Sequence, residues 1–253
     1  MNMENYSKRT YEIMDVCLLA GKILLQNGGE TYRVEDTMTR IAESFGLLHT
    51  HSYVTPTVII FSIDGIEQTK LVRIMDRSTD LKKVTQVNSI SRRISNGEHT
   101  VDEALHELKQ VEAANEFFPT IVQIAAASLA SGCFLIMFLG VWSDFIPAMI
   151  TGGLGFSSMI YVHRLVKLKF FAEFMASFVI GIFAVIFIKL GIGTDLDKII
   201  IGSVMPLVPG LLITNAVRDL MAGHLVSGLS KGAEAFLTAF AIGAGIAIVF
   251  SFL

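Results

Sequence analysis

Two segments of the chain combine glycine or proline with charged and hydroxyl side chains in patterns that suit binding of a small polar molecule. The first, residues 28–35, reads GGETYRVE. Glycines before a helix start leave backbone N–H groups free, and these groups can hold an anion. Arg33 and Glu35 add opposite charges beside them. A corner between two helices with a local ion pair is the alternative, and the residues leave both interpretations open.

The second segment, residues 205–210, reads MPLVPG and contains Pro206, Pro209 and Gly210 within an apolar stretch. Proline removes a backbone donor and clashes with the carbonyl four residues earlier, so a helix is predicted to break here. Broken helices expose backbone groups at depth in a membrane, and transporters bind substrates at such breaks. A kink satisfied by neighbouring helices is the alternative. Hydrogen-bonding side chains nearby are Ser203, Thr214 and Asn215.

Carboxylates beside apolar segments are candidates for carrying protons. The chain has four of them, Asp144, Glu173, Asp219 and Glu234. We select Asp219 and Glu234 as the proton-coupling candidates. All four are expected near helix ends, where a side chain reaches water at little cost, and this simple interpretation is favoured for Asp144 and Glu173. Asp219 could also form a helix-end ion pair with Arg218.

Motifs for other chemistries are missing from the sequence. It contains no phosphate-binding Gly-x-x-x-x-Gly-Lys-Ser/Thr loop, no His-Glu-x-x-His and no Gly-x-Ser-x-Gly. A net charge of −3 gives no basic surface for nucleic acid, and Cys17 and Cys133 are the only cysteines. We therefore expect no catalytic residues, no cofactor, no metal and no nucleic-acid partner.

The distribution of charge divides the 253 residues into two parts. Residues 1–117 hold 13 Lys and Arg and 17 Asp and Glu, whereas residues 118–253 hold only 7 and 6. Hydrophobic residues make up 52% of the chain and charged residues 17%, below the roughly 25% typical of soluble domains. The sequence predicts a membrane protein with an N-terminal cytoplasmic α+β domain, residues 1–115, followed by a transmembrane helical domain, residues 116–253.

Five apolar runs are long enough, or nearly so, to cross a bilayer. They cover residues 117–143, 145–162, 170–188, 199–217 and 235–253, and the fourth is the one expected to be broken by prolines. The loop after the second run carries Arg164, Lys167 and Lys169, which places it in the cytoplasm by the positive-inside rule. The N-terminal domain is then cytoplasmic and the C-terminus lies outside. Small residues in the first and fifth runs predict close helix contacts, within the bundle or with another subunit.

The N-terminal part alternates helical and strand patterns. Apolar spacing predicts helices over residues 11–27, 32–45 and 80–95. Residues 51–63 are β-rich, with Pro56 at an edge or bulge, and an Asp64-Gly65 turn leads to a second strand near Lys70. Thr100 and Glu103 form a capping box that opens a last helix.

The same segments resemble the bacterial threonine/serine exporter (ThrE-like) family. The resemblance rests on residues 29–35, on Thr55-Pro56-Thr57, on residues 207–210 and 214–223, and on Ser227-Gly228. It covers nearly the whole chain. The family's motif residues correspond here to Glu30, Arg33, Glu35, Thr55, Pro56, Pro206, Pro209, Gly210, Asn215, Arg218, Asp219 and Gly228.

This resemblance implies a multi-pass protein of the bacterial inner membrane that exports small hydrophilic metabolites. Threonine and serine are the family's named substrates, some split members look like dicarboxylate exporters, and the proton motive force is the expected energy source. Fused members carry a second membrane half. The chain therefore looks like the large subunit of a two-gene system, with a small membrane-embedded partner, lipid contacts and an oligomeric assembly.

Two other functions fit the residues. One is a membrane-anchored enzyme with its site at Glu30, Arg33 and Glu35, and the other is a sensor in which the broken helix is only structural. The lack of a nucleophile–base motif weighs against the enzyme, and the predicted helix break weighs against the sensor.

Overall fold

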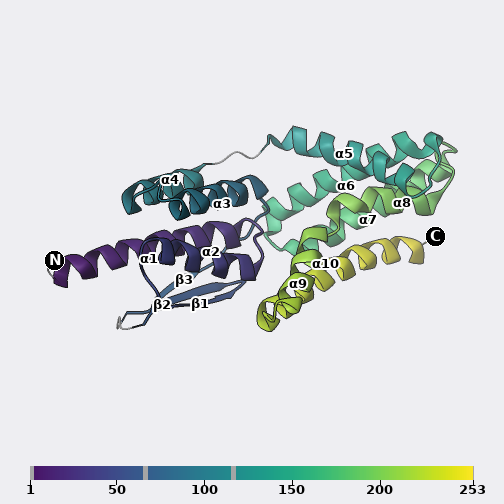
Figure 1. Ribbon diagram of the computed structural model, residues 1–253. Coiled ribbons are helices and arrows are strands. Elements are labelled where there is room, and N and C mark those ends of the chain that lie inside the picture. The colour runs from purple at the N-terminus through teal and green to yellow at the C-terminus, as the bar shows by residue number, and fades with distance from the viewer. Residues whose placement is uncertain (1–2, 65–67, 115–117, 253) are drawn as a thin grey trace. The chain divides into compact units, whose positions relative to one another are not determined.

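The structure is a computed structural model that describes residues 3–64, 68–114 and 118–252 (Figure 1). Contacts group the chain into two compact units. Unit 1 comprises Met1–Asn115 with Leu211–Gly232, and unit 2 comprises Glu116–Gly210 with Ala233–Leu253. The expected boundary at residues 115 and 116 lies outside the described residues. Residues 211–232, which the sequence places in the membrane half, group by contact with the N-terminal part.

Unit 1 contains the helices that the apolar spacing predicts. The helices over 11–27, 32–45 and 80–95 are confirmed, although the first begins at Met3. Unit 1 is built from α1 (Met3–Gln26), α2 (Thr31–Ser44), β1 (Thr50–Thr55), β2 (Val58–Ile63), β3 (Lys70–Arg73), α3 (Leu81–Ser95), α4 (Val101–Ala113), most of α9 (Gly210–Met221) and the start of α10 (Leu225–Ser251).

The prediction of one strand over residues 51–63 is wrong. Two antiparallel strands, β1 and β2, occupy this stretch, and Thr55 pairs with Val58 across a two-residue connection formed by Pro56 and Thr57. Proline has a fixed φ and no N–H, which suits a turn better than a place within a strand. β3 pairs antiparallel with β2, so the sheet order is β1-β2-β3. Gly65, half of the predicted Asp64-Gly65 turn, lies outside the described residues.

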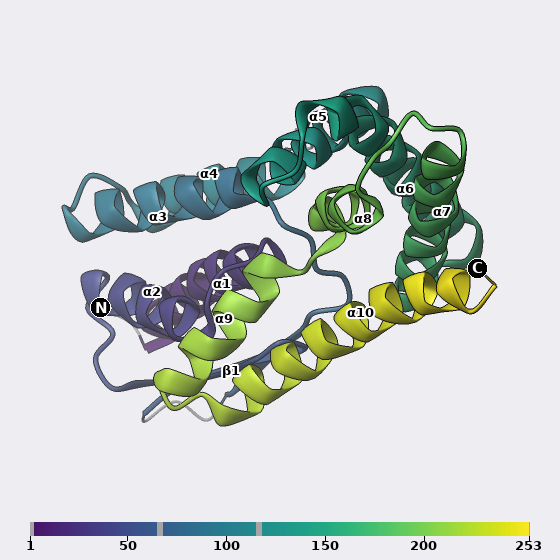
Figure 2. The ribbon, with the colours of Figure 1, turned by 90° about the vertical axis from the view of Figure 1, so that its right-hand side faces the viewer.

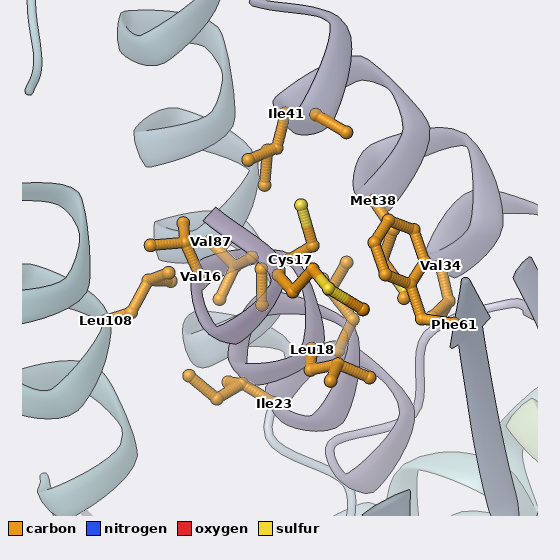
Figure 3. Packing of buried hydrophobic residues seen from close by; sticks show 14 of the residues in the cluster. Val16, Cys17, Leu18, Ile23, Val34, Met38, Ile41, Phe61, Val87 and Leu108 are labelled. Carbon is orange, nitrogen blue, oxygen red and sulfur yellow. The ribbon is translucent and has the colours of Figure 1, made fainter. Parts of the chain in front are cut away.

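The core of unit 1 lies around α1. This helix contacts the sheet through β2 and β3 and also packs against α2, α3 and α4. Val16, Cys17 and Ile23 of α1 meet Met38 of α2 and Phe61 of β2 in this core (Figure 3). Burial raises the pKa of the Cys17 thiol well above its usual range, which suits its predicted role in packing rather than in reaction.

Local signals fix several helix ends in unit 1. α1 ends with Gly28 at a φ of 97°, and the Gly29 N–H donates to Leu24 O at 2.8 Å. This is the left-handed Schellman ending that glycine favours. The capping box at Thr100 and Glu103 is confirmed, because each of these two residues accepts the other's backbone N–H.

Unit 2 is a helical bundle made of α5 (Thr120–Met137), η1 (Trp142–Asp144), α6 (Phe145–Val166), α7 (Lys169–Lys189), α8 (Leu196–Val204), η2 (Met205–Leu207) and the remainder of α10. In the described part of the chain, four helices are long and apolar enough to cross a membrane. They are α5, η1 with α6, α7 and α10. The number rises to five if Leu196–Leu207 and Gly210–Met221 together count as one interrupted span.

Small residues permit close helix contacts inside unit 2. A Cβ atom on Gly202 of α8 would lie 2.9 Å from Ser131 O of α5, and one on Gly245 of α10 would meet Phe174 O of α7. Such close approach is the usual use of small residues in membrane bundles. These small-residue positions therefore serve packing within the chain, whereas Gly243 faces open space.

Candidate functional site

A cluster of charged side chains in unit 1 joins the first of the two segments that the sequence singles out to residues that follow the second. There, α9 contacts Gly28, just after the end of α1, and Thr31, the first residue of α2 (Figure 2). The start of α2, α9 and the first turns of α10 supply its members. We call it the carboxylate cluster, and it consists of Glu30, Thr31, Arg33, Asn215, Arg218, Asp219 and Lys231.

Asp219 is the centre of the cluster and is fully buried. Its Oδ1 accepts the Thr31 backbone N–H at 3.0 Å, and its Oδ2 accepts the Thr31 hydroxyl at 2.8 Å. Lys231, also buried, donates to Asp219 Oδ2 at 2.7 Å. Thr31 is the first residue of α2, so an anion does occupy this helix start, and it is a carboxylate from the chain itself.

Glu30 has a different set of partners. Its Oε1 lies 2.5 Å from Arg218 Nη1, and its Oε2 lies 3.3 Å from Arg33 Nε. The Glu30 side chain is 8% exposed, whereas those of Arg218 and Arg33 are 54% and 40% exposed. Arg218 thus pairs with Glu30, while its neighbour Asp219 pairs with Lys231. The cluster carries three cations against two carboxylates, with both guanidinium groups at its open side.

Close contacts at two glycines join α9 to the end of α1 and to α10. Asn215 Nδ2 donates to Gly28 O at 2.8 Å. A Cβ on Gly28 would lie 3.2 Å from Leu211 Cδ2. Gly228 of α10 packs directly on α9, because a Cβ there would lie 2.9 Å from the Leu220 backbone nitrogen. Glycine at 28 and 228 therefore serves close approach within unit 1.

A second set of polar side chains forms hydrogen bonds with the edge of β1 that does not pair with β2. Glu35 Oε1 accepts the Val54 N–H at 2.9 Å, and the Ser227 hydroxyl donates to Val54 O at 3.1 Å. His224 Nδ1 lies 3.9 Å from Glu35 Oε1. Burial raises the pKa of Glu35, and the bond from Val54 opposes this rise only in part. Thr55 is buried at the end of the same strand, beside Pro56.

The remaining residues predicted for the transport path lie apart from the cluster. Ser203 in unit 2 is buried and donates to Ala148 O at 3.1 Å. Pro206 lies in η2, Pro209 lies between η2 and α9, and Gly210 begins α9. Thr214 is exposed on α9, the helix that carries Asn215 into the cluster.

The expectation that these carboxylates reach water at helix ends is wrong for Asp144, Glu173 and Asp219, because all three are buried. Asp144 accepts the Thr194 N–H and hydroxyl and the Asp195 N–H, at 2.8–2.9 Å. Loop and helix neighbours therefore cover these carboxylates, which a position along an apolar run cannot predict. Glu234 pairs with Lys169 at 2.8 Å. Among the described residues, no group of three or more His, Cys, Asp or Glu could hold a metal.

Sequence reasoning missed Lys231 as a member of the site. A lysine between Ser230 and Gly232, just before the apolar part of α10, is the signal that could have shown it. Thr31 was part of the first motif but had no role assigned. Both residues belong to the hydrogen-bonded centre of the cluster.

Comparison with known proteins places these motifs in a family context. The family model described as "Putative threonine/serine exporter" matches residues 15–253. A "Probable threonine/serine exporter" of Mycobacterium tuberculosis is 24% identical over 91% of this chain, which spans only 44% of that relative. "Probable succinate transporter subunit YjjP" of Escherichia coli K12 is 26% identical over 91% of both chains, and that of Klebsiella aerogenes is 24% identical. No solved structure matches the chain.

Proposed function

Because the chain belongs to the threonine/serine exporter family, we propose that it is a subunit of a secondary exporter for small hydrophilic metabolites. The observation that carries this proposal is the family match over residues 15–253. Relatives named for threonine and serine and for succinate support amino acids or dicarboxylates as the substrate classes. Both classes carry a carboxylate, which the exposed guanidinium groups of Arg33 and Arg218 suit.

The driving force in this proposal is the proton motive force. The exporter lies in the bacterial inner membrane, with residues 1–115 in the cytoplasm and the C-terminus outside. Support comes from Arg164 in the last turn of α6, Lys167 after it and Lys169 at the start of α7, which the positive-inside rule assigns to the cytoplasm. Leu253 itself lies outside the described residues.

The transport path in this proposal runs along the fourth span, which is broken by Pro206 and Pro209. In its support, η2 ends at Leu207 and α9 begins at Gly210, so the regular helix is interrupted around Pro209. Proline withholds a backbone N–H and frees carbonyl groups that a polar solute can contact. Arg218, on α9 after the break, would receive the carboxylate of the solute.

The exporter also contains a small membrane-embedded subunit of the same family. The two relatives that match this chain along about nine-tenths of their length are both named as transporter subunits. A sensor or a membrane-anchored enzyme is the competing function, and its site would be the carboxylate cluster. The exposed guanidinium groups could bind an anion in either case.

Efflux from loaded vesicles separates these functions. Vesicles that contain the full chain and the small subunit are loaded with radiolabelled threonine or radiolabelled succinate, and a pH gradient is applied. If the chain is an exporter, at least one of these solutes is released faster than from vesicles that hold the same solute but no protein. If it is a sensor or an enzyme, both release rates stay at the level of the vesicles without protein.

A further inference from the structure

Glu173 is a buried carboxyl group inside a helix of membrane-spanning length. It is the fifth residue of α7, and only 6% of its surface is exposed. Charged side chains inside membrane segments are costly and usually functional. Whether Glu173 has a structural or a functional role depends on which groups surround it.

One oxygen of the Glu173 carboxyl group, Oε2, has no hydrogen-bond partner among the described residues. The Thr238 hydroxyl of α10 is near enough to favour the charged carboxylate, but its geometry falls short of a hydrogen bond, since Glu173 Oε2 and Thr238 Oγ1 both stay unpartnered among the described residues. Thr238 is itself fully buried. A buried polar atom without a partner is rare and calls for a functional or structural explanation.

Charged groups near Glu173 come from three helices. Lys169 lies one turn earlier on α7, Glu234 lies on α10, and His163 lies near the end of α6. Lys169 already pairs with Glu234, at 2.8 Å. Another helix, α8, also packs on α7. Its charged residues lie in its first turn, which follows the C-terminal end of α7, whereas Glu173 lies near the N-terminal end of α7. The nearest cation therefore belongs to another carboxylate.

Asp144 shows what a purely structural carboxylate looks like in the same unit. It is buried as deeply as Glu173, but it accepts three hydrogen bonds from Thr194 and Asp195. A carboxylate with such donors is stable in its charged form. Glu173 Oε2 has no such donor among the residues that the structure describes, so holding Glu173 as the neutral acid costs less than holding it as a lone charge.

We propose that Glu173 is the proton-binding carboxyl group of this exporter. The inference rests on the proposed export function and names the residue that couples it to protons. The proton comes from water and bonds to a carboxylate oxygen of Glu173. While Glu173 is neutral, Lys169 stays with Glu234 and holds α7 against α10. When Glu173 releases its proton, Lys169 gains a second carboxylate in its own helix, and its tie to α10 weakens.

Exchange and gradient-driven flux test this assignment separately. Vesicles with the full chain and the small subunit are assayed with radiolabelled threonine and with radiolabelled succinate. Exchange of labelled for unlabelled solute at equal pH reports the export function. Wild-type exchange is expected with at least one solute, and Glu173→Gln should keep this exchange but lose flux driven by a pH gradient. Glu173→Asp, which still titrates, should keep both.

Infrared spectra of the full chain in vesicles give a readout that needs no substrate. A step from acidic to alkaline pH should remove a carboxylic C=O band that is missing in Glu173→Gln and present in Glu234→Gln. Thr238→Val should shift that band, because the neighbouring hydroxyl is gone.

The proposal is overturned if Glu173→Gln keeps wild-type gradient-driven flux, or if the band depends on Glu234 and not on Glu173. If wild-type vesicles exchange neither solute, the export function with these substrates fails, and the infrared band alone then decides whether Glu173 binds a proton.

Discussion

Asp219 caps the helix that begins at Thr31, although 188 residues separate the two in sequence. The carboxylate takes the first backbone N–H of α2 and the Thr31 hydroxyl, and Lys231 balances its charge. A carboxylate at a helix N-terminus is stabilised by the free N–H groups and the helix dipole. This contact fastens α9 and the start of α10 to the N-terminal helices within unit 1.

Breaking the Asp219–Lys231 pair should destabilise unit 1. Both side chains are buried, and removing one partner of a buried ion pair costs about 3–5 kcal/mol. We therefore expect Asp219→Asn and Lys231→Met to lower the unfolding free energy of unit 1 by about this amount. A thiol-reactive dye can measure it in a Cys133→Ser background, because Cys17 is buried in the core of unit 1 and Cys133 is exposed.

Arg218→Gln is the matched control for this experiment. Its guanidinium group is half exposed, and Glu30 keeps Arg33 as a second cation. Loss of an exposed ion pair costs less than about 1 kcal/mol. If Asp219→Asn is as stable as Arg218→Gln, the buried pair does not hold unit 1 together.

Glu35 should make the stability of unit 1 depend on pH. Burial raises its pKa in the folded protein above the ordinary value of 4.5. The folded state then holds the proton more tightly than the unfolded state does. The contribution of Glu35 to stability is therefore full below the unfolded pKa and is lost as the pH rises through the folded pKa.

Glu35→Gln should remove this dependence, because glutamine does not titrate. Its side-chain oxygen can still accept the Val54 N–H, so the contact with β1 is kept. The dye reaction of Cys17, followed from about pH 4.5 upward, should show the variant gaining stability relative to the wild type. A constant difference across this range would contradict the assignment.

Much of unit 1 could be predicted from the sequence because its helices carry local signals. Apolar spacing located α2 and α3, and the capping box located the start of α4. The sheet was predicted less well, since Pro56 fits an edge, a bulge or a turn by local rules alone. Only the pairing of Thr55 with Val58 shows that it forms a turn.

The carboxylate cluster could be predicted only in its parts. Glycines before α2 indicated a bound anion, but many anions fit such a site, and the sequence does not show that Asp219 reaches it. Arg218 and Asp219 are adjacent, so an ion pair between them was a natural expectation. The two residues take different partners because the structure brings Glu30 to one and Lys231 to the other.

Substrate entry should depend on Arg218 more than on other basic residues. If its exposed guanidinium group receives a carboxylate, Arg218→Gln lowers the efflux of threonine or succinate from loaded vesicles. Arg164→Gln removes a similar charge, from a guanidinium group that donates to the Thr120 hydroxyl at 3.0 Å, and it should change efflux less. Equal and small effects of the two substitutions would favour a structural ion pair at Arg218.

Pro209→Ala should impair transport without removing the protein from the membrane. Alanine restores an N–H and favours helix, so it tends to join η2 to α9 across the interruption. Efflux should fall while the amount of protein in the membrane fraction stays at the wild-type level. Wild-type efflux from a correctly inserted Pro209→Ala variant would exclude the interruption from the transport path.

The chain should need a second subunit to move solute. Two relatives of nearly the same length are named as transporter subunits, and the family member from Mycobacterium tuberculosis is more than twice as long as the part this chain matches. Inverted halves that meet around a central site are a common transporter plan. Vesicles with the purified chain alone should therefore show little flux of radiolabelled threonine or succinate. Addition of the small subunit should restore flux, whereas the small subunit alone should give none. Full flux from the purified chain by itself would refute the two-subunit exporter and favour a homo-oligomer that transports alone.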